Sequence, residues 1–379
     1  MAPRTVLIVG GAGFIGSHTA DSLLALGHNV RVLDCLDPQV HGPSGRFPAY
    51  MASSIDMRRG DVRDMDAVVG ALEGVDTVYH LAARTSTARS MYQMRDHVDV
   101  NVTGTATLWD AIAARGGVER VVLASSRAVY GEGAYRCEAC GPVMPAGRSQ
   151  AQLDDGLWDP RCPRCGASAT CIATAEPQPP APQSVYGATK LYQEQLSARA
   201  AATLGVALVV LRYFNVYGPR QALGNAYTGI ANVFCARRLD GLPIELFEDG
   251  QPIRDFVSVH DVARANLLAL SSAPPSGPVN VGSGVATTIR EMAQAICRGL
   301  GLDPLIEVTG WSRVGDIRSC FADARMARET LGWRTEVELD AGIAELVRWV
   351  CGEERQGGAY AAMLEEIRGN GVLRVAATS

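Results

Sequence analysis

The sequence of 379 residues contains no apolar run near the length of about 18 residues that a membrane-spanning helix needs. It also lacks basic clusters: 35 Lys and Arg residues stand against 40 Asp and Glu, and the formal net charge is −5. We therefore expect no nucleic-acid or membrane partner, because each would require concentrated positive charge or a long apolar segment. The apolar start is interrupted by regularly spaced glycines and does not fit a signal peptide, so a cytoplasmic location is the expectation.

Cysteine is scarce as well, with 10 residues in the chain, which excludes a disulfide-based scaffold. Hydrophobic residues make up 47% of the sequence, enough to bury a large core in one large domain or two fused ones. These absences leave a globular protein whose expected partners are small molecules.

The N-terminal segment predicts a dinucleotide-binding unit, because "RTVLIVGGAGFIGSHTADSLLALGHNVRVLD" reads as strand, glycine turn, helix and a second strand ending at Asp34. Gly11, Gly13 and Gly16 meet the spacing G-x-G-x-x-G, and Gly10 extends it. Such glycines let the backbone approach a pyrophosphate at a helix N-terminus. Asp34 would accept hydrogen bonds from ribose hydroxyls and repel a 2′-phosphate, which predicts NAD rather than NADP. The alternative is a structural glycine turn beside a surface Asp.

Further strand patterns occur at 56–64, 75–83 and 118–126, with helices expected at 64–73 and 101–115. Strands and helices that alternate in this way pack as a parallel sheet with helices on both faces. The sequence therefore predicts an α/β fold with a Rossmann-type, doubly wound parallel sheet.

A second motif predicts redox chemistry. The segment "SVYGATKLYQEQ" places Tyr186 and Lys190 four residues apart, on one face of a predicted helix. A nearby ammonium favours the phenolate, so it would lower the pKa of Tyr186 from about 10 toward the range in which tyrosine acts as a general base. Upstream, "SSRAVYG" contains Ser126. A surface Tyr–Lys pair and a serine that caps a strand end are the alternatives.

With these motifs in order, the chain resembles the extended short-chain dehydrogenase/reductases of the nucleotide-sugar epimerase/dehydratase family, along nearly its whole length apart from the cysteine segment. "LRYFNVYGPRQ", "IRDFVSVHDVA" and "RVGDIRSCFAD" fit the same family. The resemblance implies that Ser126, Tyr186 and Lys190 are catalytic. It implies further cofactor contacts at Phe14, Ile15, Asp61, Val62, Leu81, Ala82, Ala83, Asn101, Tyr186 and Lys190. It implies substrate contacts at Arg84, Thr85, Ser86, Asn215, Arg254, Arg313 and Asp316.

Within the substrate set, the resemblance assigns the diphosphate to Arg254 and Arg313, whose guanidinium forks match phosphate oxygens. It assigns Asn215 to the sugar or phosphates and Asp316 to the nucleotide ribose. For Arg84 two interpretations stay open, an acidic or phosphorylated ligand and a structural ion pair.

The expected reaction follows from a difference between this sequence and the 4,6-dehydratases of the family. Those dehydratases carry an Asp–Glu pair directly after the active-site Ser or Thr, whereas this chain has Arg127 and Ala128 there. Neither residue can act as that acid–base pair, so elimination is not expected. The expectation is an NAD-dependent nucleotide-sugar 4-epimerase, an isomerase of carbohydrate biosynthesis that passes through a 4-keto intermediate. The alternatives are a nucleotide-sugar dehydrogenase, reductase or dehydratase, and a non-catalytic NAD-binding protein with a zinc docking module.

The cysteines form two matched knuckles, Cys137-x-x-Cys140 and Cys162-x-x-Cys165, separated by 21 residues and each followed by glycine. Tight turns let both sulfurs of a knuckle face one ion, and two knuckles complete a tetrahedral thiolate shell. The pattern predicts a structural zinc site, in an insertion at 132–181. A redox-active thiol pair and disulfides are the alternatives.

The expected organisation is an NAD-binding domain over 1–211, which carries the insertion, and a mainly substrate-binding part over 212–379, of which some segments return to the first. Within the family, the chain is similar to UDP-galactose 4-epimerases. "SMY", "YGEG", the cysteine pairs and "NVYGPRQALGNAYTGI" resemble more narrowly the 4-epimerases of the dTDP-L-rhamnose type. The resemblance also implies a homodimer, because members commonly pair through a bundle of helices that includes the tyrosine helix.

Overall fold

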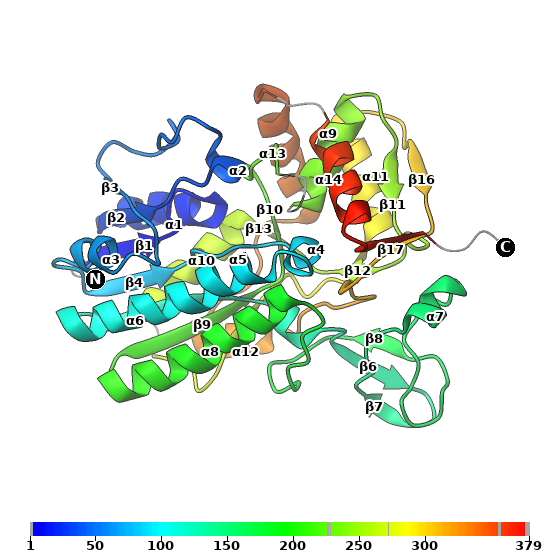
Figure 1. Cartoon of the computed structure of the whole chain (residues 1–379), viewed down its shortest axis with the longest axis horizontal. Helices are drawn as coiled ribbons and strands as arrows, with labels where there is room; N and C mark the ends of the chain where they lie inside the picture. Colours follow the sequence, from blue (N-terminus) through cyan, green and yellow to red (C-terminus); the bar gives the residue numbers. More distant parts are fainter. Residues whose placement is uncertain (1–2, 226, 228, 272, 355–357, 376–379) are drawn as a thin grey trace.

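The computed structural model describes residues 3–225, 227, 229–271, 273–354 and 358–375. Its centre is a seven-stranded sheet in the order β14-β9-β5-β4-β1-β2-β3, and every neighbouring pair in it is parallel (Figure 1). The strands are β1 (Thr5–Val9), β2 (Asn29–Asp34), β3 (Asp56–Arg59), β4 (Thr77–His80), β5 (Arg120–Ser126), β9 (Ala207–Tyr213) and β14 (Val279–Val281). The expected doubly wound parallel sheet is confirmed.

Helices cover both faces of this sheet because its strands alternate apolar side chains between two buried sides. In β1, Val6 and Ile8 pack into the core beneath α1, α10 and α12, whereas Leu7 and Val9 pack toward α3, α6 and α8. Figure 1 shows α1 and α10 on one side of the sheet and α6 and α8 on the other. The bounds are α1 (Phe14–Ala25), α10 (Val259–Ser271), α12 (Arg325–Leu331), α3 (Met65–Ala71), α6 (Gly104–Arg115) and α8 (Val185–Leu204).

The two helices expected between the strands are present, with bounds that differ from the expected ones. The helix expected at 64–73 is α3, which begins after Asp64 because that side chain accepts the backbone N–H groups of Asp66 and Ala67. The helix expected at 101–115 begins earlier, with a π-helical turn at Asp99–Thr103 that continues into α6. The other short elements are α2 (Pro38–His41), α4 (Thr87–Ser90), α5 (Met94–Val98) and a 3₁₀ turn (Arg127–Tyr130).

The smaller half packs around its own apolar core, which includes Phe234, Leu246, Met292 and Leu346. It contains the parallel pairs β10 (Asn215–Tyr217) with β13 (Phe256–Ser258) and β11 (Ile244–Leu246) with β16 (Ile306–Val308). The antiparallel pairs are β12 (Ile253–Arg254) with β15 (Thr287–Thr288) and β17 (Trp311–Arg313) with β18 (Leu373–Val375). Its helices are α9 (Ile230–Leu239), α11 (Ile289–Leu300), α13 (Leu339–Gly352) and α14 (Ala359–Gly369).

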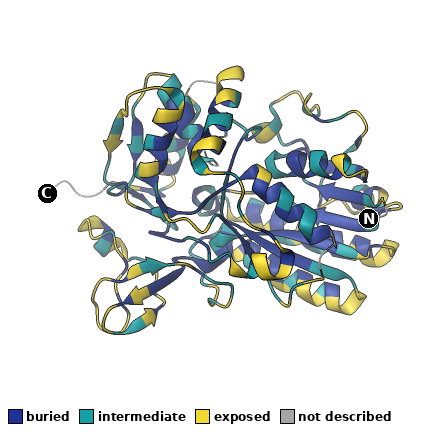
Figure 2. Cartoon of the chain, turned by 180° about the vertical axis from the view of Figure 1, so that it is seen from behind, coloured by how far each residue is buried: buried dark blue, intermediate teal, exposed yellow. Residues whose placement is uncertain are grey.

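The cysteine segment folds as a separate small layer, in which β6 (Ala134–Cys137) lies between β7 (Gly141–Val143) and β8 (Thr170–Ile172). A short helix, α7 (Gln150–Asp154), follows β7. Figure 2 shows that the loops of this layer project from the body of the molecule and are largely exposed, whereas the strands of the main sheet are buried. Cys171 lies in β8 rather than in a loop, and its thiol is free.

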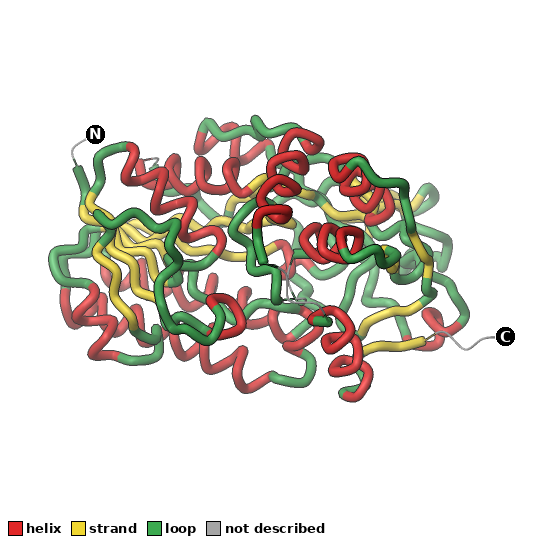
Figure 3. Tube along the Cα trace, turned by 90° about the horizontal axis from the view of Figure 1, so that it is seen from above, coloured by secondary structure: helices red, strands yellow, loops and turns green. Residues whose placement is uncertain are grey.

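The arrangement leaves the site between the two halves. Seen from above, the strands of the main sheet gather at the left of the view, with helices above and below them (Figure 3). Within the part of the chain that is described, no helix has both the length and the apolar character that crossing a bilayer requires.

Candidate active site

A cleft of ≈ 620 Å³ runs from the glycine turn after β1 to the smaller half of the molecule. Gly10 adopts a φ of +81°, and a Cβ atom there would lie 2.6 Å from the backbone nitrogen of Ala82. A Cβ on Gly16 would lie 2.5 Å from the carbonyl oxygen of Gly10. Both positions therefore require glycine, because turn and helix lie against each other. Helix α1 begins at Phe14 beside the cleft, so its first N–H groups can receive an anion.

Asp34 lies at the other end of the part of the cleft that begins at the glycine turn, which we call the cofactor half. Its carboxylate is buried and accepts hydrogen bonds from the backbone N–H groups of Ala12 at 3.0 Å and Leu36 at 2.9 Å. These bonds hold the side chain at the end of β2, where it lines the cleft with Gly10 and Gly13. That is the position of a ribose-binding carboxylate in a dinucleotide fold.

The other residues predicted to contact the cofactor divide into two groups. Most of them line the cleft, namely Phe14, Ile15, Gly16, Asp61, Val62, Leu81, Ala82 and Ala83. Gly11 and Asn101 lie behind its wall. A Cβ on Gly11 would meet Val32, and Asn101 is buried, accepting from Arg84 N at 2.7 Å and donating to Arg84 O and Thr189 Oγ1. Asn101 thus links the loop after β4 to helix α8.

The three residues expected to be catalytic come together where the two halves of the cleft meet. Ser126 ends β5, and its Oγ accepts the Ala128 N–H at 3.1 Å, so it both caps the following turn and lines the cleft. Tyr186 stands in the first turn of α8 and lines the cleft together with Ser126. Lys190 lies one turn further along, buried, and its Nζ donates to Ala124 O at 2.9 Å.

The pKa of Tyr186 differs in direction from the sequence expectation. Burial raises the pKa of Tyr186, although the hydrogen bond with Ser126 and the charge of Arg127 act to lower it. Burial also lowers the pKa of Lys190 to about 7, against the influence of the Glu194 carboxylate. The expected lowering of the Tyr186 pKa by Lys190 is therefore wrong for this arrangement of side chains, because desolvation of the phenol outweighs the charge of Arg127, and Lys190 is not among the groups that shift this pKa.

At the far end of the cleft, two arginines share one carboxylate. Asp316 accepts from Arg254 Nη2 at 3.2 Å and from Arg313 Nη2 at 2.8 Å. Burial alone would raise the pKa of Asp316, but the two guanidinium groups hold it well below its usual range. We call Arg254, Arg313 and Asp316 the clamp. It brings together the three side chains that the sequence assigned to diphosphate and ribose.

The predicted sugar-pocket residues after β4 have structural partners. Arg84 forms ion pairs with Asp37 and, at 2.7 Å, with Asp96, which favours the structural interpretation left open by the sequence. Thr85 offers its carbonyl oxygen to His97 at 3.3 Å. Ser86 caps α4 and adopts a φ of +97°, a backbone conformation that is uncommon outside glycine and concentrates at functional sites. All three predicted residues line the cleft.

Sequence reasoning missed the positive charge at the centre of the cleft. Arg127 follows Ser126 and donates from Nε to Asn215 Oδ1 at 2.9 Å. Among the residues that are described, none accepts a hydrogen bond from its Nη1 or Nη2 atoms, and Arg127 lines the cleft. Burial, with a smaller contribution from Arg254, lowers the pKa of Arg127 to about 10, so the guanidinium stays charged at neutral pH. The sequence offered one signal for this role, because Arg127 directly follows the strand pattern that ends at Ser126.

The position of the C-terminal helix at the site was missed as well. Tyr360 and Met363 of α14 line the cleft, and Met363 packs in a cluster with Leu373 of β18. Most of the other residues that line the cleft lie more than a hundred positions before α14. No local sequence pattern can indicate so distant a contact, so the sequence did not place this helix at the site.

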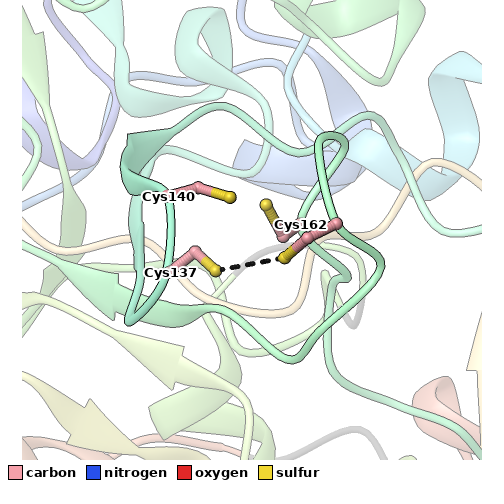
Figure 4. A group of neighbouring side chains, drawn as sticks. Cys137, Cys140 and Cys162 are labelled. Atoms are coloured by element: carbon pink, nitrogen blue, oxygen red, sulfur yellow. Dashed lines mark hydrogen bonds between the residues drawn. The ribbon is translucent and has the colours of Figure 1, made fainter.

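The four paired cysteines meet in space. Their sulfur atoms all lie within 4.8 Å of one another, and Cys137 Sγ is 3.6 Å from Cys165 Sγ. In Figure 4 the sulfurs of Cys137, Cys140 and Cys162 point toward a common centre from two facing loops. All four are free thiols rather than disulfides. Because sulfurs bound to one zinc at about 2.3 Å lie somewhat under 4 Å apart, this donor set fits a tetrahedral zinc ion.

A profile of the NAD dependent epimerase/dehydratase family matches residues 6–150 and 165–282, well over half of the chain. The chain belongs to this family. It is 38% identical over 354 residues to a dTDP-L-rhamnose 4-epimerase from Burkholderia thailandensis, covering 92% of this chain and 96% of that protein.

Other relatives have different names. A dTDP-glucose 4,6-dehydratase from Actinoplanes sp. is 31% identical, over 91% of this chain and 97% of that protein. The structure of UDP-glucose 4-epimerase from Thermus thermophilus in complex with NAD superposes with a TM-score of 0.74 at 30% identity, covering 92% of this chain and all of that one. The fold is therefore that of solved epimerases.

The cysteine geometry generates a test. We expect the purified protein to contain about one zinc per chain. Replacing Cys137 with Ser should abolish stoichiometric zinc and lower the unfolding temperature by several degrees, while NAD binding persists because the glycine turn lies in another layer. Elemental analysis and thermal unfolding measure both effects. Cys351→Ser, at an exposed free cysteine in α13, is the matched control. A Cys137→Ser variant that retains both zinc and stability would refute the site.

Proposed function

We propose that the protein is an NAD-dependent nucleotide-sugar 4-epimerase with a structural zinc site. One observation carries the proposal: Ser126, Tyr186 and Lys190 line one cleft, between a glycine turn that fits a pyrophosphate and a clamp that fits a diphosphate. The similarity to 4-epimerases over more than nine-tenths of the chain supports the same interpretation. Similarity to the Burkholderia protein favours a dTDP-linked sugar as the first candidate.

Each catalytic side chain has a definite task in this proposal. Ser126 hydrogen-bonds the reacting C4 hydroxyl, Tyr186 takes its proton, and Lys190 holds the Tyr186 face of α8 against β5 through Ala124. Bound NAD, held by the glycine turn and Asp34, supplies the chemistry of accepting a hydride and returning it. The sugar passes through a 4-ketone, and return of the hydride to the opposite face inverts C4.

The dehydratase alternative is disfavoured by the side chains beside Ser126, even though one relative carries that name. Arg127 and Ala128 occupy the two positions, and the guanidinium stays charged at neutral pH. We propose instead that the unpartnered Nη atoms of Arg127 hydrogen-bond hydroxyl oxygens of the sugar ring.

The assembly proposed is a cytoplasmic homodimer that pairs through the outer faces of α6 and α8. Tyr192, on α8, is an exposed aromatic side chain of that face, with an exposed fraction of 49%. Light scattering of the purified protein should give twice the mass of one chain, and the mass of one chain would refute the pairing.

The reaction is tested with UDP-, dTDP-, GDP-, CDP- and ADP-sugars in deuterated buffer, read by NMR and mass spectrometry. An epimerised product without solvent deuterium is expected, because hydride returns directly to C4. Deuterium at C3 or C5, or loss of water, would contradict the proposal, and stoichiometric NADH would favour a dehydrogenase. Tyr186→Phe should lower kcat by about 10²- to 10⁴-fold with NAD affinity unchanged. Tyr192→Phe, on the exposed side of the same helix, is the control. Equal kcat in both variants would contradict the catalytic role of Tyr186, and unaltered cellular function of Tyr186→Phe would favour the non-catalytic alternative.

The role of Arg127 has its own test. Arg127→Met should lower kcat/KM for the sugar nucleotide by about 10- to 100-fold, the cost of losing charge-assisted hydrogen bonds worth about 1.5–3 kcal/mol. Steady-state kinetics of the active sugar nucleotide measures it. Arg46→Met changes an exposed arginine outside the cleft and should leave kcat/KM within about twofold, the ordinary scatter of a surface change. An Arg127→Met variant with unaltered kcat/KM would remove Arg127 from the substrate site.

A further inference from the structure

The loop between the two cysteine pairs, residues 141–161, carries a side chain into the interior of the molecule. The side chain of Arg148 is only 3% exposed, although its neighbours in the loop are largely exposed. Its Nη1 atom lies 2.7 Å from Glu248 Oε1 and donates to Trp158 O at 3.1 Å. Its Nε atom lies 3.4 Å from Glu132 Oε1. A loop on the surface thus supplies a buried cation to two buried carboxylates.

Glu248 also forms an ion pair with a second arginine, Arg318. Its Oε2 atom accepts from Arg318 Nη1 at 3.0 Å, and both side chains are 5% exposed or less. The same loop reaches Arg318 again through Asp159, whose Oδ1 lies 2.8 Å from Arg318 Nε. Glu132 accepts the backbone N–H of Arg318 at 2.8 Å. We call Glu132, Arg148, Glu248 and Arg318 the buried ion network.

The buried ion network holds the chain segment on which the clamp is built. Arg254 donates to the carbonyl oxygens of Arg318 at 2.9 Å and Ile317 at 2.8 Å, as well as to the Asp316 carboxylate. From the other side, Arg148 Nη2 donates to Asp316 O at 3.4 Å. Residues 316–318 are therefore held between Arg254, which faces the cleft, and the loop of the cysteine insertion.

We propose that Arg148 is a positioning residue for the nucleotide-sugar clamp, and that the four-cysteine insertion serves to present it. The inference rests on the proposed function and deepens it, because it assigns the insertion to substrate binding. The paired cysteines close both ends of the loop, which fixes Arg148 and Asp159 in register with Glu248 and Arg318. Removing the Arg148 cation leaves Glu132 without a cationic partner and Glu248 with Arg318 alone, and residues 316–318 shift with these carboxylates. Among the described residues, no hydrogen bond or ion pair joins the network to the cofactor half of the cleft, which therefore stays unchanged.

The test compares ligand affinities in Arg148→Met and the unaltered protein by titration calorimetry with dTDP, UDP and NADH. Arg148→Met should weaken binding of whichever nucleotide diphosphate binds the unaltered protein by about 3- to 30-fold, with the Kd for NADH and the zinc content unchanged. Arg148→Lys keeps the positive charge but loses the planar guanidinium with its several donors. Its affinity for the nucleotide diphosphate should therefore lie between those of Arg148→Met and the unaltered protein. Arg136→Met, at an exposed arginine of β6 in the same insertion, is the matched control.

The outcomes separate the two ideas. If neither dTDP nor UDP binds the unaltered protein, the dTDP-linked sugar proposed as the first candidate fails, and GDP, CDP and ADP replace dTDP in the same comparison. If one binds and Arg148→Met binds it equally well, or binds NADH more weakly to the same degree, the positioning role is overturned. KM should rise with kcat nearly constant, a split that general destabilisation would not produce. Should Arg148→Met not fold, Asp159→Asn tests the second link of the loop, with a smaller expected loss because Asp159 is largely exposed.

Discussion

The site depends on one constraint, the parallel alignment of the strands in the main sheet. Because neighbouring strands run the same way, their carboxyl ends meet at one edge, and ligands in open α/β sheets bind there. Gly10 follows β1, Asp34 ends β2, Leu81 follows β4 and Ser126 ends β5, so residues more than a hundred positions apart line one cleft. Tyr186 joins them because α8 packs on β5. A change of strand direction anywhere in β1 to β5 would disperse the whole set.

Burial then determines the electrostatics at that edge. The ammonium of Lys190 and the phenol of Tyr186 are both shifted toward their neutral forms by loss of water, while the clamp stays ionised because Asp316 has two guanidinium partners. The cleft therefore combines a desolvated Tyr186–Lys190 pair for proton transfer, beside the charged Arg127, with an ion-paired end for binding. The positive charge of Arg127 acts against this burial and favours the phenolate of Tyr186, where a base is needed.

The sequence predicted those features that depend on local spacing. The glycine pattern around Gly10, the four-residue step from Tyr186 to Lys190 and the two cysteine knuckles each need only a few neighbouring residues, and the structure brings each set together. The direction of the Tyr186 pKa was missed because burial is a property of the fold. The link from Arg148 to Glu248 spans a hundred residues and two layers, so no pattern along the chain could indicate it.

The cysteine insertion cannot be held by apolar packing alone. Its buried cluster is small, consisting of Tyr135, Val143, Ala169 and two of the cysteines themselves, and a core of that size does not order a long exposed loop. In the proposed zinc site, four thiolates on one ion supply the missing rigidity at the two ends of the loop. Rigidity at those points matters because a buried ion pair is favourable only when its geometry is maintained. The proposed zinc site on the surface and the ion pairs beneath the clamp thus form, in this proposal, one continuous structural connection.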